Sequence, residues 1–416
     1  MKQTLATLGV AALTCAAVAS VPTTSDAAPH ARTTQTTVDP VIGWNRFLLG
    51  LQAGPGQQPA TVQPTYELAV MHAAIYDAAA AVDRGPASAP AAVDAAAHDT
   101  LVALYPTLRA SIDQQYASEL ATVPGGLRRA LGIKVGEQAA AKQLRARAND
   151  GSTAAPLPFQ PGTNPGDYQL TPPAFAPPAF THWSRVKPFV LRNAAQFRPP
   201  PPPALTSAKY AAAIDEVKAL GAATGSTRTA DQTQIGLFWN PPIWATWNRI
   251  AQTAALAHHG SLLDDARTFA ALNLTFADSV IAFYDAKYTY RLWRPVTAIR
   301  TTDPAWTPLS NTAPDPSYPG AHGTISAAGA DVLSEVYGND FSFDVDSTAL
   351  PGVLRSFVSF TEAAQEASVS RIYNGNHTRV DQVAGENLGH NVARYVLAHL
   401  PPSSPRCDRC SGYPQP

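Results

Sequence analysis

Apolar residues recur at spacings of three and four along most of this chain, which is the pattern of α-helices that bury one face. The pattern begins near Asp39 and includes the stretches VIGWNRFLLGLQ, PTYELAVMHAAIYDAAAAVD and AHDTLVALYPTLRASIDQQYASEL. It resumes after about residue 205, where we expect helices over SAKYAAAIDEVKALG, IWATWNRIAQTAALAHHG, Ser261 to Arg294, GTISAAGADVLSEVYG, 350–370 and 378–400. Because strand-like alternation is nearly absent, the sequence predicts an all-α helical bundle.

The stretch from about 155 to 204 interrupts this pattern. It contains PLPFQPGTNPGDYQLTPPAFAPPAF and RPPPPPAL, which hold many of the chain's 38 prolines. Proline lacks an amide donor and blocks helix interiors, so we expect an extended crossing segment here. Its aromatic residues Trp183, Phe189 and Phe197 indicate that it packs on a surface. We therefore expect one all-helical domain over 29–416, with its motif-bearing core at about 205–400.

Composition and charge limit the classes of partner. The chain has 416 residues, of which 45% are hydrophobic, and this is enough to bury a large core. Charged residues make up 15% and the formal net charge is −1, so no overall field attracts nucleic acid or an anionic membrane. Any site for an anion must therefore be a local cluster of cations.

The first residues predict export. Lys2 precedes a short, alanine-rich apolar run, and small residues follow up to SDAAPHA, so residues 1–28 are expected to form a secretory signal peptide. No later segment is long and apolar enough to span a membrane. In the exported chain only Cys407 and Cys410 would remain, and they are expected to form a disulfide, since a zinc site would need two further ligands.

The first candidate for chemistry is a pair of cations in KYTYRLWRP. Lys287 and Arg294 are seven residues apart, which is two helical turns and would bring both side chains onto one face. Pro295 would end the helix close to Arg294. An ordinary solvated basic face is the alternative, because Arg291 and Arg300 lie nearby.

Two histidines follow, each beside a predicted helix start. His322 comes directly after the turn at Gly320 in PSYPGAHGTISAAGADVL, where free backbone amides and the helix dipole favour an anion. His377 comes after Gly375 in SRIYNGNHTRVDQVAGENLG, four residues before Asp381, which could fix its tautomer. Arg371, across the glycine turn, would supply a forked donor for a tetrahedral oxyanion.

Together these segments form one ordered pattern: Lys, six residues, Arg-Pro; a Pro-x-x-His turn; and Ser-Arg, five residues, His, three residues, Asp. The pattern resembles the superfamily that joins vanadium-dependent haloperoxidases to type 2 phosphatidic acid phosphatases and bacterial acid phosphatases. The start at Trp44, the MHAAIYDA helix and the FWNPPIWATWN stretch look like its soluble, secreted bacterial haloperoxidase-like branch.

The resemblance implies a role for each residue. His377 would bond to vanadium or phosphorus, His322 would be the acid–base group, and Asp381 would support His377. The oxyanion, vanadate or phosphate, would be bound by Lys287, Arg294, Gly320, Ala321 and Arg371. The haloperoxidase interpretation has hydrogen peroxide, a halide and a small organic acceptor as substrates, with Lys287 polarising the peroxide. The phosphatase interpretation has a phosphate ester, with His377 as nucleophile, and a non-catalytic oxyanion-binding homologue is a third possibility.

Two positions depart from the superfamily's usual pattern. Gly320 and Ala321 stand where most members have Ser-Gly, so a hydroxyl contact to the oxyanion is missing. Asp315 stands seven residues before His322, where the haloperoxidase branch usually has an aromatic residue or histidine facing the halide. An ionised carboxylate there would repel halide, whereas a carboxylate between two prolines often points to solvent, and the sequence leaves both open.

Overall fold

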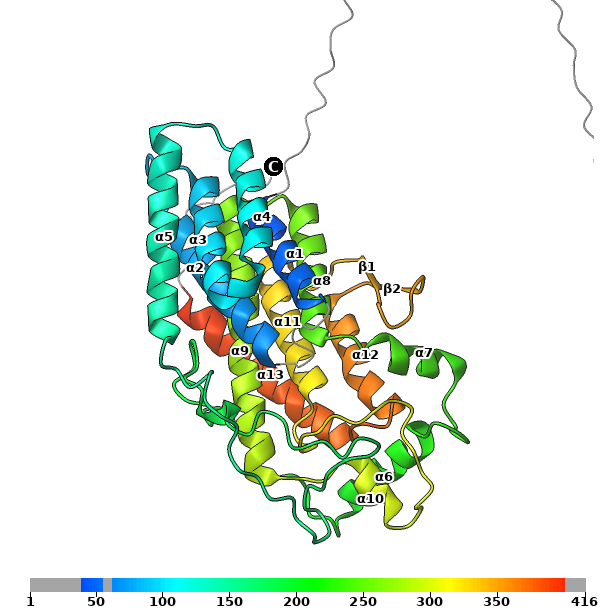
Figure 1. Cartoon of the computed structure of the whole chain (residues 1–416). Helices are drawn as coiled ribbons and strands as arrows, with labels where there is room; N and C mark the ends of the chain where they lie inside the picture. The colour runs from blue at the N-terminus through cyan, green and yellow to red at the C-terminus, as the bar shows by residue number, and fades with distance from the viewer. Residues whose placement is uncertain (1–38, 55–61, 401–416) are drawn as a thin grey trace, which may run out of the picture. The chain divides into compact units, whose positions relative to one another are not determined.

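The computed structural model describes residues 39–54 and 62–400, and it confirms the all-α prediction (Figure 1). Over these residues the chain forms thirteen α-helices, two 3-10 turns and one two-stranded hairpin. The predicted signal peptide and the cysteines Cys407 and Cys410 lie outside the described residues. Among the helices described, none is both long and apolar enough to cross a membrane.

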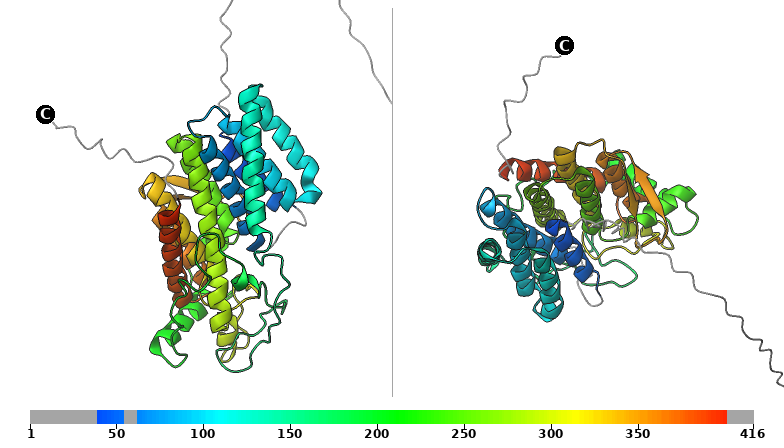
Figure 2. Two further views of the ribbon diagram at one scale, coloured as in Figure 1. Left: turned by 90° about the vertical axis from the view of Figure 1, so that its left-hand side faces the viewer. Right: turned by 90° about the horizontal axis from the view of Figure 1, so that it is seen from above.

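The amino-terminal helices pack together on one side of the bundle, blue to cyan in Figures 1 and 2. They are α1 (Pro40–Gln52), α2 (Val62–Val82), α3 (Ala89–Leu104), α4 (Arg109–Thr122) and α5 (Leu127–Arg147). The carboxylate of Asp39 caps α1 by accepting the amide of Val41 at 2.7 Å. Pro106 divides the stretch that was predicted as one helix into α3 and α4, with a 3-10 turn, η1 (Pro106–Leu108), between them.

The helices after the proline-rich segment carry the predicted motifs. They are α6 (Ala208–Leu220), α7 (Ala230–Phe238), α8 (Ile243–His258), α9 (Leu262–Tyr290), α10 (Pro295–Arg300), α11 (Ala321–Tyr337), α12 (Phe360–Tyr373) and α13 (Arg379–His399). Helix α9 is buried along most of its length and packs against α2, α11 and α13. It therefore forms the centre of the bundle, as Figure 2 shows.

Two further expected helix boundaries are wrong, and two helices were missed. Helix α9 ends at Tyr290 and does not reach Arg294, because Arg291 adopts a left-handed conformation (φ 51°). The expected helix over 350–370 begins only at Phe360, after an antiparallel hairpin of β1 (Phe343–Asp346) and β2 (Leu354–Phe357). Helices α5 and α7 were not predicted, and α5 packs closely on α3 across Gly132 and Gly136.

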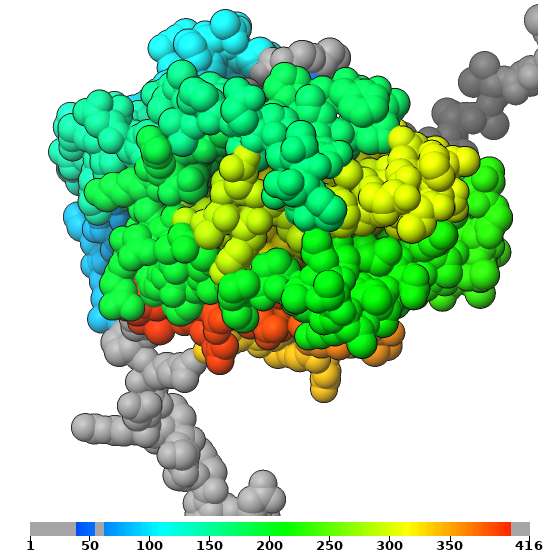
Figure 3. All heavy atoms as spheres, turned by 90° about the horizontal axis from the view of Figure 1, so that it is seen from below, coloured from blue at the N-terminus to red at the C-terminus, as the bar shows by residue number. Residues whose placement is uncertain are grey.

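The proline-rich segment packs on the bundle, as its aromatic residues predicted. Its only regular element within the described chain is the 3-10 turn η2 (Trp183–Arg185), and Trp183 is buried. The carboxylate of Asp278 on α9 accepts the backbone amides of Phe189, Val190 and Leu191 at 2.6, 2.8 and 2.8 Å. These bonds fix the segment against α9, and it spreads in green over the face seen in Figure 3.

Candidate functional site

The predicted motif residues meet at one cavity of about 250 Å³, which we call the oxyanion cavity. Its lining includes Lys287, Arg294, His322, Arg371 and His377. They come from the last turn of α9, the N-cap of α10, the first turn of α11, the end of α12 and the residues before α13. Asp381 lies behind His377 and is fully buried.

Lys287 and Arg294 converge for a reason that the helical spacing did not predict. The chain leaves α9 at Arg291, and Arg294 caps α10 in an extended conformation (φ −82°, ψ 155°). The two side chains therefore do not share a helix face, contrary to the expectation from their spacing. They approach each other because both contact Asp315, and each is only 1% exposed.

A backbone hydrogen bond joins the start of α11 to the first turn of α13, which has a capping box of its own. Thr378 and Asp381 form a capping box, in which the Thr378 amide donates to Oδ2 of Asp381 at 2.8 Å. The amide of Gly320 donates to the backbone carbonyl of Asp381 at 2.8 Å. Because this amide is committed, the amides at this turn without a protein acceptor in the described chain are those of Ala321 and His322.

The two nitrogens of His377 have different partners. Nε2 lies 2.9 Å from Nη1 of Arg294, and because a guanidinium only donates, Nε2 is an acceptor without a proton. Nδ1 lies 3.4 Å from Oδ2 of Asp381, which also accepts the Ser317 hydroxyl at 2.7 Å. Asp381 is thus placed to hold the proton of His377 on Nδ1, as the four-residue spacing predicted. Burial, and then the positive charges of Arg294 and Lys287, lower the pKa of His377 well below its usual value.

His322 is oriented by the backbone of the segment before α8. Its Nε2 lies 2.9 Å from the carbonyl oxygen of Trp239, so Nε2 carries the proton and Nδ1 is the free base. Burial and the nearby Arg371 lower the pKa of His322 well below its usual value, against the effect of the carbonyl bond. The neutral imidazole can therefore accept a proton at Nδ1.

Asp315 lies inside the site and does not point to solvent. Its Oδ1 is 3.0 Å from Nζ of Lys287 and 2.5 Å from Nη2 of Arg294, and its Oδ2 accepts from the Tyr284 hydroxyl at 3.3 Å. Burial alone would raise the pKa of Asp315, but Lys287 and Arg294 bring it to about 2. Burial lowers the pKa of Lys287 to about 8, although Asp315 opposes the shift. The carboxylate is therefore ionised and paired with both cations.

Arg371 is the cation with unused donors. Its Nη1 donates to the side-chain oxygen of Asn240 at 3.1 Å, and its buried Nε has no acceptor in the described chain. Burial and Arg294 lower the pKa of Arg371 to about 9. A buried donor without a partner costs free energy, so this residue fits an anion that accepts from it.

A second wall of the cavity is apolar. It comes mainly from the segment leading into α8 and from α9, and it consists of Pro241, Pro242, Ile243, Trp244, Phe283 and Tyr284. Asn240, at the edge of this wall, was not predicted as a site residue. The FWNPPIW stretch in which it lies is the sequence signal that could have identified it.

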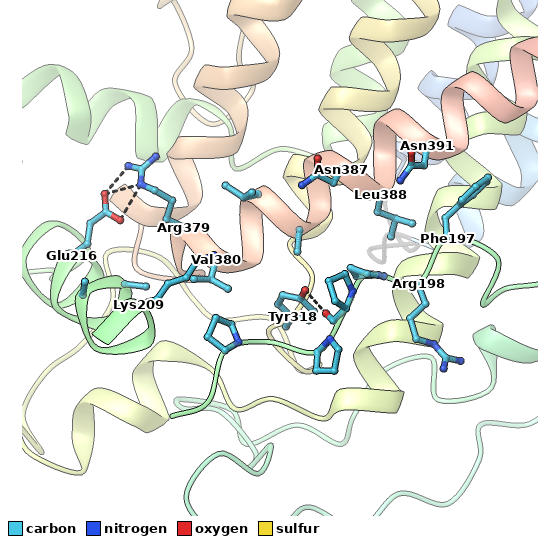
Figure 4. A pocket seen from close by; sticks show the side chains of 18 residues that line it. Phe197, Arg198, Lys209, Glu216, Tyr318, Arg379, Val380, Asn387, Leu388 and Asn391 are labelled. Carbon is cyan, nitrogen blue, oxygen red and sulfur yellow. Dashed lines mark hydrogen bonds and ion pairs between the residues drawn. The ribbon is translucent and has the colours of Figure 1, made fainter. Parts of the chain in front are cut away.

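A larger groove of about 700 Å³ lies along the first half of α13 (Figure 4). It is lined by Pro199, Pro200, Pro201 and Pro203 and by residues of α6 and α13, and it shares no lining residue with the oxyanion cavity. Tyr318, whose hydroxyl donates to the carbonyl of Pro200 at 2.7 Å, forms part of its wall. Four charged side chains line it: Glu216 and Arg379 pair with each other at 2.6 Å, Arg198 pairs with Asp285, and the fourth is Lys209. The cations that line the groove are exposed, so it lacks a buried cluster like that of Lys287, Arg294 and Arg371.

Comparisons with known proteins agree with the predicted superfamily. A family model described as the VCPO second helical-bundle domain matches residues 267–402. Vanadium chloroperoxidase from Curvularia inaequalis is 25% identical, in a match that covers 45% of this chain and 43% of that protein. The chain therefore spans less than half the length of this curated relative.

Solved structures are similar over almost the whole described chain. The structure of a bacterial vanadium-dependent iodoperoxidase has a TM-score of 0.77 and 27% sequence identity, over 88% of this chain and 97% of that one. A holo-type bacterial vanadium-dependent chloroperoxidase has a TM-score of 0.66 and 16% identity, over 84% and 96%. The second likeness supports the fold alone.

Proposed function

Because the chain belongs to the superfamily of the vanadium-dependent haloperoxidases, we propose that it uses vanadate and hydrogen peroxide to oxidise a halide to hypohalous acid. The observation that carries the proposal is the oxyanion cavity. Three buried cations and two neutral histidines line a space of about 250 Å³, large enough for a tetrahedral oxyanion and a small second reactant. The product would halogenate a small organic acceptor.

The residues present fit vanadate. His377 has an unprotonated Nε2, which would hold the metal in place of its present hydrogen bond from Arg294, and Arg371 has a buried Nε without an acceptor. The amide of Ala321 at the start of α11 would add a further donor, even without the hydroxyl that most members have at the preceding position. When bound, vanadate supplies the centre at which hydrogen peroxide is activated for attack by a halide.

The side chains of this chain would then each do one task. His322 accepts a proton from hydrogen peroxide at Nδ1, while its Nε2 stays bonded to the Trp239 carbonyl. Arg371 neutralises negative charge, and Lys287 and Arg294 add to this neutralisation. Asp381 keeps the proton of His377 on Nδ1 so that Nε2 remains a ligand.

The apolar wall favours the larger halides. Iodide and bromide lose their hydration shells more easily than chloride and are easier to oxidise. A halide between the cations and the ring of Trp244 or Phe283 would be largely dehydrated. We therefore propose that iodide and bromide are oxidised more readily than chloride.

The test uses the mature chain after removal of bound anions. It is assayed with vanadate, hydrogen peroxide and each halide, beside a phosphate-ester assay without vanadate. Halide oxidation that requires vanadate and is inhibited by phosphate is the expected result. Ester hydrolysis inhibited by vanadate, without halide oxidation, would instead assign the site to a phosphatase. Vanadate binding with neither activity would assign it to a non-catalytic oxyanion-binding protein.

We also propose that the enzyme acts outside the cell, on the basis of the first 28 residues. Expression of the full chain in a bacterial host should release a protein into the medium or periplasm whose amino terminus lies near residue 29. An intact amino terminus on a protein retained in the cytoplasm would contradict this.

A further inference from the structure

The ammonium group of Lys287 has no free donor for an oxyanion in this structure. Its Nζ lies 3.0 Å from Oδ1 of Asp315 and 3.4 Å from the carbonyl oxygen of Ser317, and it also donates to the carbonyl oxygen of Pro316. An ammonium has three hydrogens, so these three acceptors account for all of them. Lys287 thus contributes positive charge to the oxyanion cavity while its donors are already bound.

Arg294 is almost as fully committed. Its Nε donates to the carbonyl oxygen of Asp315 at 2.8 Å, and its Nη2 donates to Oδ1 of the same residue at 2.5 Å. Its Nη1 donates to the carbonyl oxygen of Asn376 at 3.0 Å and to His377 at 2.9 Å. Of the five donors of a guanidinium, a single one on Nη2 is free in this structure, and bonding of His377 Nε2 to vanadium would release a second one on Nη1.

We propose that Asp315 is an internal counter-anion that competes with the oxyanion for Lys287 and Arg294, and so weakens the binding of phosphate and vanadate. The proposal rests on the proposed function, because it concerns the affinity of the same cavity. Asp315 is therefore a specificity-determining residue. It disfavours multiply charged oxyanions, which must enter beside a fixed negative charge.

The stability of the anion-free protein gives a physical reason for such a residue. Lys287 and Arg294 are each 1% exposed, and two buried cations without a counter-ion would strongly destabilise the fold. Asp315 supplies this counter-ion, with Tyr284 donating to its second oxygen. Arg371, in contrast, has no carboxylate partner within the described residues, so it remains available to attract an anion.

The affinity of the cavity is then set by two opposing charges. An oxyanion bound near the cations is attracted by Arg371 and by the positive charge of Lys287 and Arg294 that Asp315 does not neutralise. It also meets the negative charge of Asp315 at a distance of a few ångströms. Removing one like charge at this distance should strengthen anion binding on the order of tenfold or more.

The experiment measures binding without peroxide or halide. Asp315→Asn and the smaller Asp315→Ser are compared with the unmodified protein, all purified in phosphate that is then removed by dialysis. Equilibrium dialysis gives Kd for inorganic phosphate, and vanadium NMR gives Kd for vanadate. Asp285→Asn is the matched control, because Asp285 lies on α9, the helix that carries Lys287, and pairs with Arg198 at 2.6 Å, and its substitution changes the net charge equally.

The expected result is a Kd that is lower by about tenfold or more for both Asp315 variants, with Asp285→Asn unchanged. Variants that fold only in the presence of phosphate would also support the proposal, since the anion would then replace the carboxylate. Equal or weaker binding by the variants, or failure to fold even in phosphate, would overturn it. If the unmodified protein and all variants bind neither anion, the proposed function itself is wrong.

Discussion

Nε2 of His322 lies 2.9 Å from the backbone carbonyl oxygen of Trp239, and this contact determines which nitrogen can do chemistry. A carbonyl only accepts, so the proton is on Nε2 and the lone pair is on Nδ1. Trp239 is 1% exposed and its indole donates to Glu366 at 3.0 Å, so the carbonyl belongs to a fixed part of the fold. The base of the site is therefore oriented before any substrate binds.

His322→Ala should separate catalysis from binding. We expect kcat for halide oxidation to fall by about 100-fold or more, because a positioned general base is lost. The Kd for vanadate should change little, since His322 is not among the residues proposed to hold it. Steady-state kinetics and vanadate titration of the same preparation measure the two effects. A variant whose vanadate affinity falls while kcat at saturating vanadate stays unchanged would contradict this role.

His377→Ala should abolish vanadate-dependent activity. The substitution removes the nitrogen proposed as the metal ligand, and we expect vanadate affinity to fall by about 100-fold or more. Binding is measured by titration, and halide oxidation by initial rates at saturating peroxide.

The matched control is His390→Ala, a histidine on α13 outside the oxyanion cavity whose Nδ1 pairs with Asp331 at 2.8 Å. This variant should retain vanadate affinity and rate. Full activity in His377→Ala would refute the assignment of the whole site.

The helix starts that carry the site could be predicted because their sequence signals are local. Gly320 before His322, and Thr378 before Asp381, mark helix starts in the sequence, and both starts lie where they were expected. The four residues between His377 and Asp381 also keep the two side chains in contact. Features that depend on capping residues and on short spacings were therefore predicted correctly from the sequence.

The errors, the question left open at Asp315 and the residue that was missed all arise where tertiary contacts decide the outcome. Whether Asp315 faces solvent or the site depends on Lys287 and Arg294, which lie 28 and 21 residues before it. The end of α9 depends on a left-handed Arg291, a conformation that arginine seldom adopts and that the sequence does not signal. Asn240 reaches Arg371 across 131 residues of sequence. No local pattern encodes these contacts.

Asp278→Ala should loosen the proline-rich segment. The carboxylate is fully buried and accepts three backbone amides of this segment, so its removal leaves buried donors without partners. We expect the free energy of unfolding to fall by about 3 kcal/mol and limited proteolysis within 155–204 to become faster. Urea unfolding and timed proteolysis measure the two effects.

Asp285→Ala on the same helix is the control, because its partner Arg198 is partly exposed. It should cost about 1 kcal/mol or less. Equal losses in the two variants would show that the three amide bonds contribute nothing particular to stability.

Glu67 should make the protein less stable as the pH rises. Burial raises the pKa of Glu67 from 4.5 to about 7, against the hydrogen bonds from Tyr105 and Gln52. Because the folded pKa is the higher one, the contribution is fully present below about pH 4.5 and is lost as the pH rises through 7. At 1.36 kcal/mol per unit, the loss is about 3 kcal/mol.

Glu67→Gln removes this titration. The difference in unfolding free energy between the variant and the unmodified protein should therefore shift in favour of the variant from pH 5 to pH 8. Urea unfolding at the two pH values measures it, and the comparison cancels all other titrating groups. A difference that is the same at both values would mean that Glu67 titrates normally.

Gly389→Ala should weaken the contact between α11, which carries His322, and α13, which begins just after His377. A Cβ at Gly389 would lie 2.2 Å from the carbonyl oxygen of Thr324, so α11 and α13 would have to separate. Such overpacking costs about 1–3 kcal/mol. Because α11 begins beside His322 and α13 begins just after His377, we expect vanadate affinity to fall together with the thermal unfolding midpoint.

Gly50→Ala supplies the comparison, since Gly50 lies within α1 and nothing approaches within 4 Å of its position for a Cβ. An alanine in a helix is more favourable than glycine by about 0.5–1 kcal/mol, so this variant should be slightly stabilised and should bind vanadate normally. If Gly389→Ala behaves like Gly50→Ala, α11 and α13 can adjust without disturbing the site. If stability falls while vanadate binding is kept, the close contact supports the fold but does not position the histidines.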